Sequence, residues 1–273
     1  MNNTFSFHSL ILPFIYSCFV LTFILFQNYG NNQSFVVFCD VGQGDGSLIR
    51  LYNRITIVID AGPDNSILEC LGRYTPFYNR TIDIAIVSHP QKDHMFGFIE
   101  MAKRYKIRTF IIPYSVKDEK SFINLKNILI SKNVSLQYIN NSNIVYLSDA
   151  LITFLWPPTQ CKETDENDCS AIFTFKINNF RVLFTGDATF KLLETLSEKP
   201  NLKTNILKVP HHGSSHGLTE KFLRLANPEV AVISVGKKNS YGHPSKSTLD
   251  LLRALKIPIR RTDKEGDVVF KLK

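Results

Sequence analysis

Short apolar segments alternate along the chain with segments of helical periodicity. The apolar segments predict strands at residues 35–39, 46–52, 55–60, 82–87, 108–112, 134–139, 150–156, 170–177, 180–186, 205–209, 230–235 and 266–272. The amphipathic segments predict helices at residues 66–73, 95–105, 118–132, 189–198, 218–227 and 245–256. Asn178-Asn179 lies between two strands and predicts a tight hairpin. Periodicity alone therefore predicts an α/β fold without choosing its architecture.

A longer apolar segment precedes the first predicted strand. Residues 10–26 are a run of 17 mostly apolar residues, and His8 and Pro13 interrupt the wider segment 5–26. Because about 20 apolar residues cross the hydrocarbon core of a bilayer, residues 5–26 predict a transmembrane anchor or uncleaved signal. No Lys or Arg precedes Arg50, so charge does not indicate its orientation. Polar residues 27–34 predict a linker, and residues 35–273 predict one α/β domain.

The segment Ser88-His89-Pro90-Gln91-Lys92-Asp93-His94 joins a predicted strand to a predicted helix. Two imidazoles and a carboxylate crowd this turn, and borderline divalent metals favour such a mixture of nitrogen and oxygen ligands. A turn alone needs only Pro, Gly or Asn. The alternative is a polar turn with two solvated histidines, so the segment alone suggests a metal site without establishing it.

Other predicted strands also end in residues that can bind metal. They end at or near Asp60, Asp187, His211-His212 and His243. Each has a simpler explanation, since an Asp can cap a turn and a His pair can be solvent-exposed. Sites in layered α/β folds form where strands end and loops begin. The coincidence of several such ends therefore predicts a shared metal site.

These motifs resemble the metallo-β-lactamase-fold superfamily and, within it, the soluble domain of the ComEC branch of competence DNA-uptake proteins. The resemblance runs in family order through Asp40-Val41-Gly42-Gln43-Gly44-Asp45, Ile59-Asp60-Ala61-Gly62, residues 88–94, Leu183-Phe184-Thr185-Gly186-Asp187, Val209-Pro210-His211-His212-Gly213-Ser214 and residues 234–245. The first and fifth motifs are specific to the ComEC branch. The resemblance implies a four-layer αββα metallo-β-lactamase-like sandwich preceded by one N-terminal membrane segment.

The resemblance also implies roles for individual residues. The implied metal ligands are His89, Asp93, His94, Asp187, His211 and His212. The implied catalytic residues are Asp93 and His243, and second-shell or substrate roles fall on Asp45, Asp60, Ser214 and Tyr241. Gln91 and Asp168 stand where the superfamily places histidines, and ComEC-like members often carry Asp at the position of Gln91. Both are weak candidate ligands of the first of two metal positions, so we expect one or two ions, Zn or Mn, with the second position bound more firmly.

The predicted chemistry is hydrolysis of a DNA phosphodiester. A divalent ion lowers the pKa of bound water toward neutrality. The formal charge of +8 and the pI of about 9.2 favour an anionic partner, and the resemblance implies DNA. Asp93 is predicted to orient the attacking water and Asp187 to bridge two ions. His243, or a hydroxyl of Ser214 or Ser215, is predicted to contact the phosphate or the leaving oxygen. The glycine-containing loop 42–46 is interpreted as a phosphate cradle, the alternative being a tight turn.

The predicted function is a membrane-anchored, metal-dependent DNA phosphodiesterase or nuclease linked to DNA uptake. The resemblance favours an extracytoplasmic location and allows a separate channel protein as a partner. One alternative is a DNA-binding module with weakened catalysis, which Gln91 and Asp168 support. Another is a small-molecule hydrolase such as a lactonase or β-lactamase, which the ComEC-like motifs disfavour.

Five cysteines without a Cys-x-x-Cys spacing do not predict a disulfide framework. Cys161 and Cys169 can pair across a short loop if the domain faces an oxidising compartment. We otherwise expect free thiols.

Overall fold

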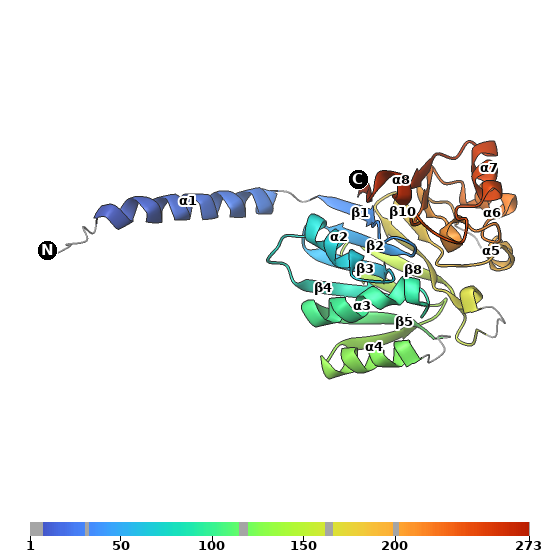
Figure 1. Cartoon of the computed structure of the whole chain (residues 1–273), viewed down its shortest axis with the longest axis horizontal. Helices are drawn as coiled ribbons and strands as arrows, with labels where there is room; N and C mark the ends of the chain where they lie inside the picture. The colour runs from blue at the N-terminus through green and yellow to red at the C-terminus, as the bar shows by residue number, and fades with distance from the viewer. Residues whose placement is uncertain (1–7, 31–32, 115–119, 162–165, 199–201, 273) are drawn as a thin grey trace.

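Two seven-stranded mixed sheets form the centre of the molecule, as Figure 1 shows for the computed structural model. The structure describes residues 8–30, 33–114, 120–161, 166–198 and 202–272. The first sheet has the order β14-β1-β2-β3-β4-β5-β6 and the second β13-β12-β11-β10-β9-β8-β7. Each sheet joins antiparallel strands to parallel ones, with β3 to β6 parallel in the first and β10 to β13 parallel in the second.

Every predicted strand has a counterpart in the structure. The first sheet contains β1 (Ser34–Phe38), β2 (Gly46–Leu51), β3 (Ile55–Ala61), β4 (Thr81–Ile86), β5 (Lys106–Pro113), β6 (Ser135–Ile139) and β14 (Val268–Leu272). The second contains β7 (Ile144–Leu147), β8 (Ala150–Trp156), β9 (Ile172–Ile177), β10 (Phe180–Phe184), β11 (Ile206–Lys208), β12 (Val230–Ile233) and β13 (Ile259–Arg261). The hairpin prediction is confirmed, because Ile177 pairs with Phe180 and Asn178 has a φ of 51°.

Helices cover the outer face of each sheet (Figure 1). The first sheet carries α2 (Ser66–Tyr74), α3 (Lys92–Arg104) and α4 (Lys120–Ser131), and the second carries α5 (Phe190–Leu196), α6 (Glu220–Ala226) and α7 (Lys246–Ala254). Shorter turns are α8 (Thr262–Glu265), η1 (Glu166–Cys169) and η2 (Pro210–Gly213).

Successive side chains of each strand point to opposite faces of its sheet, so the buried apolar residues form three clusters. In β1, Val36 and Phe38 face the second sheet, whereas Val37 packs with the helices. Between the sheets, the rings of Phe38 and Phe173 each lie within 6 Å of Phe184, at 5.9 and 5.1 Å between centroids. Each fully buried Phe contributes about 1.5–3 kcal/mol. The clusters produce the predicted four-layer αββα sandwich.

Two strands were not predicted, and both are edges of the second sheet. The alternate residues of β7 are exposed, and β13 is only Ile259–Arg261 with two arginines. Short edge strands with charged residues carry a weak apolar signal, which explains both omissions.

The N-terminal helix α1 (His8–Gly30) lies apart from the sheets in Figure 1 and continues into the predicted linker. Where its side chains are described, they are mostly apolar and exposed, as Leu12, Phe14 and Phe19 are at 79%, 70% and 66%. Among the residues that the structure describes, however, no helix is both long and apolar enough to cross a membrane. The transmembrane prediction for residues 5–26 is therefore not confirmed.

Two disulfides correct the expectation of free thiols. Cys39, directly after β1, is bonded to Cys70 of α2, and Cys161 is bonded to Cys169. The first pair is 31 residues apart in sequence and meets only because α2 packs on the first sheet. The second is the pair considered possible from the sequence. Cys18 is a free, exposed thiol.

Candidate metal centre

The candidate site lies where several strands of both sheets end. β4 leads to Ser88 and His89, and α3 begins two residues before His94. β10 leads to Asp187 and β11 to His212. The sequence folds these ends together because β3, β4 and β5 are parallel, as are β10, β11 and β12, so their carboxyl ends share an edge.

Glycines allow the backbone to close around this edge. A Cβ at Gly97 of α3 would lie 2.0 Å from the carbonyl oxygen of Ala61, so only glycine lets the helix approach the end of β3. Gly44, with a φ of +148°, would place a Cβ 2.3 Å from the carbonyl oxygen of Asp93. Both contacts fix the first turn of α3, which carries Asp93 and His94.

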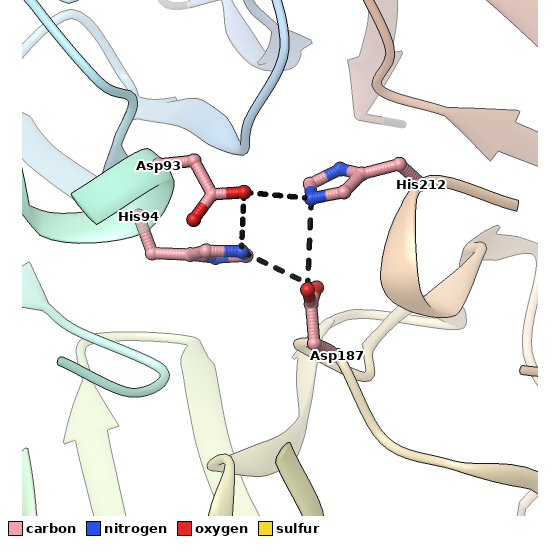
Figure 2. Close-up of side chains that lie close together, drawn as sticks. All are labelled: Asp93, His94, Asp187 and His212. Atoms are coloured by element: carbon pink, nitrogen blue, oxygen red, sulfur yellow. Dashed lines mark hydrogen bonds and ion pairs between the residues drawn. The ribbon is translucent and has the colours of Figure 1, made fainter. Parts of the chain in front are cut away.

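Four side chains converge at the centre of the site, as Figure 2 shows: Asp93, His94, Asp187 and His212. His94 Nε2 lies 3.3 Å from Asp187 Oδ1 and 3.9 Å from Asp93 Oδ2. His212 Nε2 lies 3.3 Å from Asp93 Oδ2 and 3.6 Å from Asp187 Oδ2. All four ligand atoms fall within 4.8 Å of one another, which is the geometry of a group that can hold one metal ion.

Hydrogen bonds on Nδ1 turn the Nε2 atom of each buried histidine toward the centre. His94 Nδ1 donates to Asp60 Oδ2 at 3.0 Å, and His212 Nδ1 donates to the carbonyl oxygen of Ser234 at 3.0 Å. Ser88 Oγ donates to Asp60 Oδ2 at 2.7 Å, so it accepts from His89 Nδ1 at 3.0 Å. Partners of this kind fix the tautomer of metal-binding histidines.

A second carboxylate, that of Asp45, lies near the Nδ1 atoms of His94 and His212. Its Oδ1 lies 3.3 Å from His212 Nδ1, and its Oδ2 lies 3.7 Å from His94 Nδ1. Asp45 Oδ2 also forms an ion pair with the ammonium of Lys208, whose side chain is 3% exposed. Asp45 and Asp60 thus both contact the Nδ1 side of these imidazoles, and their supporting role at a metal site stays a prediction.

The electrostatics favour opposite charges within the cluster. Burial alone would lower the pKa of His94, but Asp187 and Asp60 outweigh it and hold that pKa well above the ordinary value. Burial likewise opposes protonation of His212, yet Asp187 and Asp45 raise its pKa to about 9. For Asp187, burial raises the pKa, but His94 and His212 outweigh it and hold the pKa well below its ordinary range. The raised pKa values of the two histidines and the lowered pKa of Asp187 have the same cause, which is that the carboxylates here favour positive charge.

Buried polar atoms without a hydrogen-bond partner mark the same place. Among the described side chains these atoms include His89 Nε2, His94 Nε2 and Asp187 Oδ1. An unpaired buried polar atom costs about 1–3 kcal/mol, and a cation in the cluster would satisfy His94 Nε2 and Asp187 Oδ1, whose residues both belong to it. The residues present therefore fit a divalent ion.

The first predicted metal position is less complete. Burial and His94 lower the pKa of His89 to about 3, so its imidazole is neutral. Gln91 Nε2, however, donates to Asn167 Oδ1 at 2.9 Å. Asp168 Oδ1 accepts from the Thr189 amide at 3.0 Å and hydroxyl at 2.7 Å. Asp168 is therefore not part of the cluster, whereas the Gln91 side chain also interacts with the His89 imidazole, and the roles of both residues as weak ligands stay predictions.

The remaining predicted residues form a rim. His211 Nε2 lies 4.0 Å from Asp187 Oδ2, at the edge of the cluster, and the His243 ring is 5.8 Å from the His211 ring. Tyr241 stacks against His243 and is 70% exposed. Ser214 is buried, and its hydroxyl accepts from the His216 amide at 3.3 Å. Catalytic and substrate roles for these residues remain to be tested.

Backbone conformation at the rim is unusual. His211 and His212 have φ values of 49° and 52°. Non-glycine residues in this left-handed region carry about 1–3 kcal/mol of strain, which persists where surrounding structure imposes it. In this backbone conformation His212 Nε2 lies 3.6 Å from Asp187 Oδ2.

Two backbone amides of the loop at residues 42–46 are already hydrogen-bonded within the protein. The Asp45 amide donates to the carbonyl oxygen of Asp93 at 3.0 Å, and the Gly42 amide donates to Asp40 Oδ1 at 3.3 Å. These two N–H groups are therefore not free to bind phosphate, which favours the tight-turn interpretation.

Sequence reasoning missed Ser88 and Lys208. Ser88 belongs to the recognised motif but was not given a role, although its hydroxyl links Asp60 to His89. Lys208 is a charged residue in the otherwise apolar strand β11, directly before the His-His motif. A lysine in a buried strand requires a partner, and that signal was available in the sequence.

The sequence of the chain matches no family model. It is 25% identical over 282 residues to ComE operon protein 3 of Bacillus subtilis, covering 97% of this chain and 35% of the relative. It is 27% identical over 255 residues to competence protein ComA of Neisseria gonorrhoeae, covering 88% and 33%. The chain thus spans about a third of the length of these relatives.

Solved structures agree on the fold. The metallo-β-lactamase-fold protein YhfI of Bacillus subtilis superposes with a TM-score of 0.59 at 14% identity, covering 88% of this chain and all of YhfI. Zinc-bound PqqB of Methylobacterium extorquens has a TM-score of 0.59 at 9% identity, covering 87% of this chain and all of PqqB. The two-sheet architecture, the His and Asp cluster and the sequence relatives converge on one conclusion: this chain is a metallo-β-lactamase-fold domain homologous to ComE operon protein 3 and competence protein ComA.

Proposed function

We propose that this domain is a metal-dependent phosphodiesterase that cleaves DNA. The observation that supports it best is the convergence of Asp93, His94, Asp187 and His212, with Nε2 of both imidazoles facing the two carboxylates. Zinc-bound PqqB, which shares the fold, is consistent with a metal in such a site. The identity and number of the ions, Zn or Mn and one or two, belong to this proposal.

A divalent ion bound there would supply Lewis acidity and lower the pKa of a water molecule. The chain's own residues divide the remaining work. The side chain of Asp93 is 31% exposed, whereas those of His94, Asp187 and His212 are at most 2% exposed. The Asp93 carboxylate therefore lies where water enters, and it can accept a hydrogen bond from the attacking water. The pKa of Asp93 is low, because His212 and His94 outweigh the effect of burial, so the carboxylate is ionised.

His243 is the candidate for contacting the phosphate or the leaving oxygen. Its ring is half-buried and lies 5.8 Å from the ring of His211. Burial and the neighbouring His211 lower the pKa of His243, so the imidazole is neutral at pH 7. A neutral imidazole donates through one ring nitrogen, which suits a hydrogen bond to a phosphate oxygen.

DNA as the substrate rests on the relatives and on charge. One relative is named as a competence protein, and the chain carries a formal charge of +8. A basic protein attracts a polyanion through phosphate contacts whose strength falls as salt rises. Participation in DNA uptake, an extracytoplasmic location and a channel partner are further parts of the proposal.

The test is metal analysis of the purified chain followed by DNA cleavage with Mn²⁺, Mg²⁺ or Zn²⁺. We expect bound metal, a thermal shift when metal is added, and metal-dependent cleavage. Asp93→Ala should abolish cleavage while leaving the fold intact. Asp250→Ala is the matched control, because Asp250 is 51% exposed on α7 and should leave cleavage unchanged. Absence of both metal and a thermal shift would count against the site.

A second candidate is a DNA-binding module whose catalysis has decayed. The residue type at position 91 favours it, because a neutral amide is a weaker metal ligand than the imidazole or carboxylate that the resemblance leads one to expect there. If no metal supports cleavage, Gln91→Asp fails to restore it, and DNA binding is nevertheless tight and salt-sensitive, the binding module replaces the enzyme.

We also propose that α1 attaches the domain to a membrane. An exposed apolar surface of the kind formed by Leu12, Phe14 and Phe19 marks an interaction site, and lipid suits aliphatic and aromatic side chains without charge. The full chain should fractionate with membranes, and a chain beginning at Ser34 should be soluble and folded. Recovery of the intact full chain entirely in the aqueous fraction would refute this attachment.

A further inference from the structure

An exposed aromatic surface begins at the rim of the candidate metal centre. Tyr241 is 70% exposed, and its ring lies nearly parallel to that of His243, with 5.8 Å between centroids and 16° between planes. His243 in turn lies 5.8 Å from His211, whose Nε2 is 4.0 Å from Asp187 Oδ2. A large aromatic side chain is thus exposed to solvent close to the cluster, with His243 and His211 between them.

The loop that carries this tyrosine is held in place by internal hydrogen bonds. Asn239 Nδ2 donates to the carbonyl oxygens of Gly236 and His243, at 2.9 and 2.8 Å, and the His243 amide donates to Asn239 Oδ1 at 2.9 Å. The Ser245 amide donates to the carbonyl oxygen of Gly213 at 2.9 Å, which ties the loop to the His-His segment. Because the loop is already held in place, little conformational entropy is lost when its tyrosine ring binds a ligand.

The same loop is positively charged. Residues 234–245 contain Lys237 and Lys238 and no acidic residue. Both lysines are exposed, and neither has an ion-pair partner within 4.0 Å among the residues that the structure describes. An aromatic ring beside unpaired cations is the combination by which proteins bind single-stranded nucleic acid.

We propose that Tyr241 is a stacking platform for one unpaired base of single-stranded nucleic acid, with Lys237 and Lys238 contacting the adjoining backbone. The inference rests on the proposed function and specifies its substrate as a single strand. In a duplex each internal base is already stacked and paired, so only an unpaired or terminal base has a face to offer to one exposed ring. Base–aromatic stacking tolerates any sequence, because every base has a π-face.

The test measures binding of the full chain to an oligothymidylate and to an abasic oligomer of the same length and phosphate count, with EDTA present to prevent cleavage. Tyr241→Ala should weaken oligothymidylate binding about 5- to 150-fold, the range expected for one stacked base. Tyr241→Phe keeps the ring and should bind within about twofold of wild type. Binding of the abasic oligomer should be the same for Tyr241→Ala and wild type.

Two controls separate stacking from other effects. Tyr146→Ala removes a tyrosine that is 74% exposed on β7, an edge strand of the second sheet, and should change nothing. Replacing Lys237 and Lys238 by Gln should weaken binding of both oligomers. The slope of log affinity against log salt concentration should also become shallower by about one unit for each phosphate contact that is lost.

The outcomes distinguish this inference from the proposed function. Equal losses on both oligomers, or no loss with Tyr241→Ala, would overturn the stacking role. Metal-dependent cleavage of single-stranded DNA by wild type would leave the proposed function standing in either case. If wild type neither binds nor cleaves DNA, both fall together.

Discussion

Two neighbouring candidate metal positions on the same edge of the fold differ in how their side chains are held. In the second position the outer nitrogens of His94 and His212 are bonded to Asp60 and to the Ser234 carbonyl, so their Nε2 atoms point to the centre. In the first position, Gln91 is bonded instead to Asn167, and Asp168 is bonded to Thr189. Strand ends therefore determine where a site lies, and hydrogen bonds behind the side chains determine whether it has ligands.

This difference has an energetic basis. A buried imidazole or carboxylate without a partner is costly, so evolution can retain it only with a compensating contact. In the second position that compensation leaves the metal-facing atoms unused. In the first, hydrogen bonds already engage polar atoms of Gln91 and Asp168, and only His89 keeps a buried nitrogen without a partner among the described groups.

The largest expected effect comes from removing the shared carboxylate. Asp187 approaches three histidines, with contacts of 3.3 Å to His94, 3.6 Å to His212 and 4.0 Å to His211. Asp187→Asn keeps the shape but removes the charge, so metal affinity should fall by more than about 100-fold, beyond the range for outer contacts. Isothermal titration with Mn²⁺ or Zn²⁺ measures this, and Asp250→Asn is the exposed control. Retained affinity in Asp187→Asn would remove this residue from the site.

A smaller effect should follow from changing the residue behind His94. Asp60 accepts from His94 Nδ1 and from the Ser88 hydroxyl, so it orients ligands without touching the ion. Asp60→Asn should reduce metal affinity about 10- to 100-fold. Asparagine also tolerates the φ of 51° at this position, so the fold should persist in circular dichroism. A loss as large as that of Asp187→Asn would mean that Asp60 itself binds the ion.

Much of this fold followed from the sequence because its core strands are apolar and regular. All twelve predicted strands and six predicted helices of the α/β domain have counterparts in the structure. The two missed strands are β7 and β13, at the edges of the second sheet, where burial imposes little pattern. The Cys39–Cys70 bond was not predictable from spacing, because tertiary packing brings the two residues together.

The candidate site followed from the sequence only in part. Strand-end positions identified Asp93, His94 and Asp187, but could not choose between His211 and His212. The choice depends on two left-handed backbone conformations and a hydrogen bond to Ser234. The role of Gln91 likewise depends on Asn167, which is 76 residues away in sequence. Periodicity reports which face is buried and says nothing about such pairings.

The protonated histidines give a pH prediction for the metal-free protein. The pKa of His212 rises from 6.5 to about 9 on folding, and that of His94 is also raised. Their stabilisation is fully present below pH 6.5 and is lost as pH rises through about 9, by on the order of 1–3 kcal/mol. Urea denaturation with EDTA at pH 6 and pH 9 tests this, and His212→Gln should reduce the difference. Added metal should reverse the trend, because its ligands must first lose their protons.

The smallest expected effect, and the sharpest test of the comparison, is completion of the first position. His89 is already neutral, since burial and His94 lower its pKa to about 3, and its Nε2 has no hydrogen-bond partner among the described groups. Gln91→Asp shortens the side chain, breaks the 2.9 Å bond to Asn167 and supplies a charged oxygen ligand. Metal content should rise from about one ion toward two per chain, about a twofold change, with DNA cleavage rising alongside it. Gln137→Asp, on exposed β6, controls for added charge. Unchanged metal content in Gln91→Asp would mean that residue 91 does not limit metal binding at the first position. Thr189→Val would then test the other explanation, because it removes the hydroxyl that is bonded to Asp168.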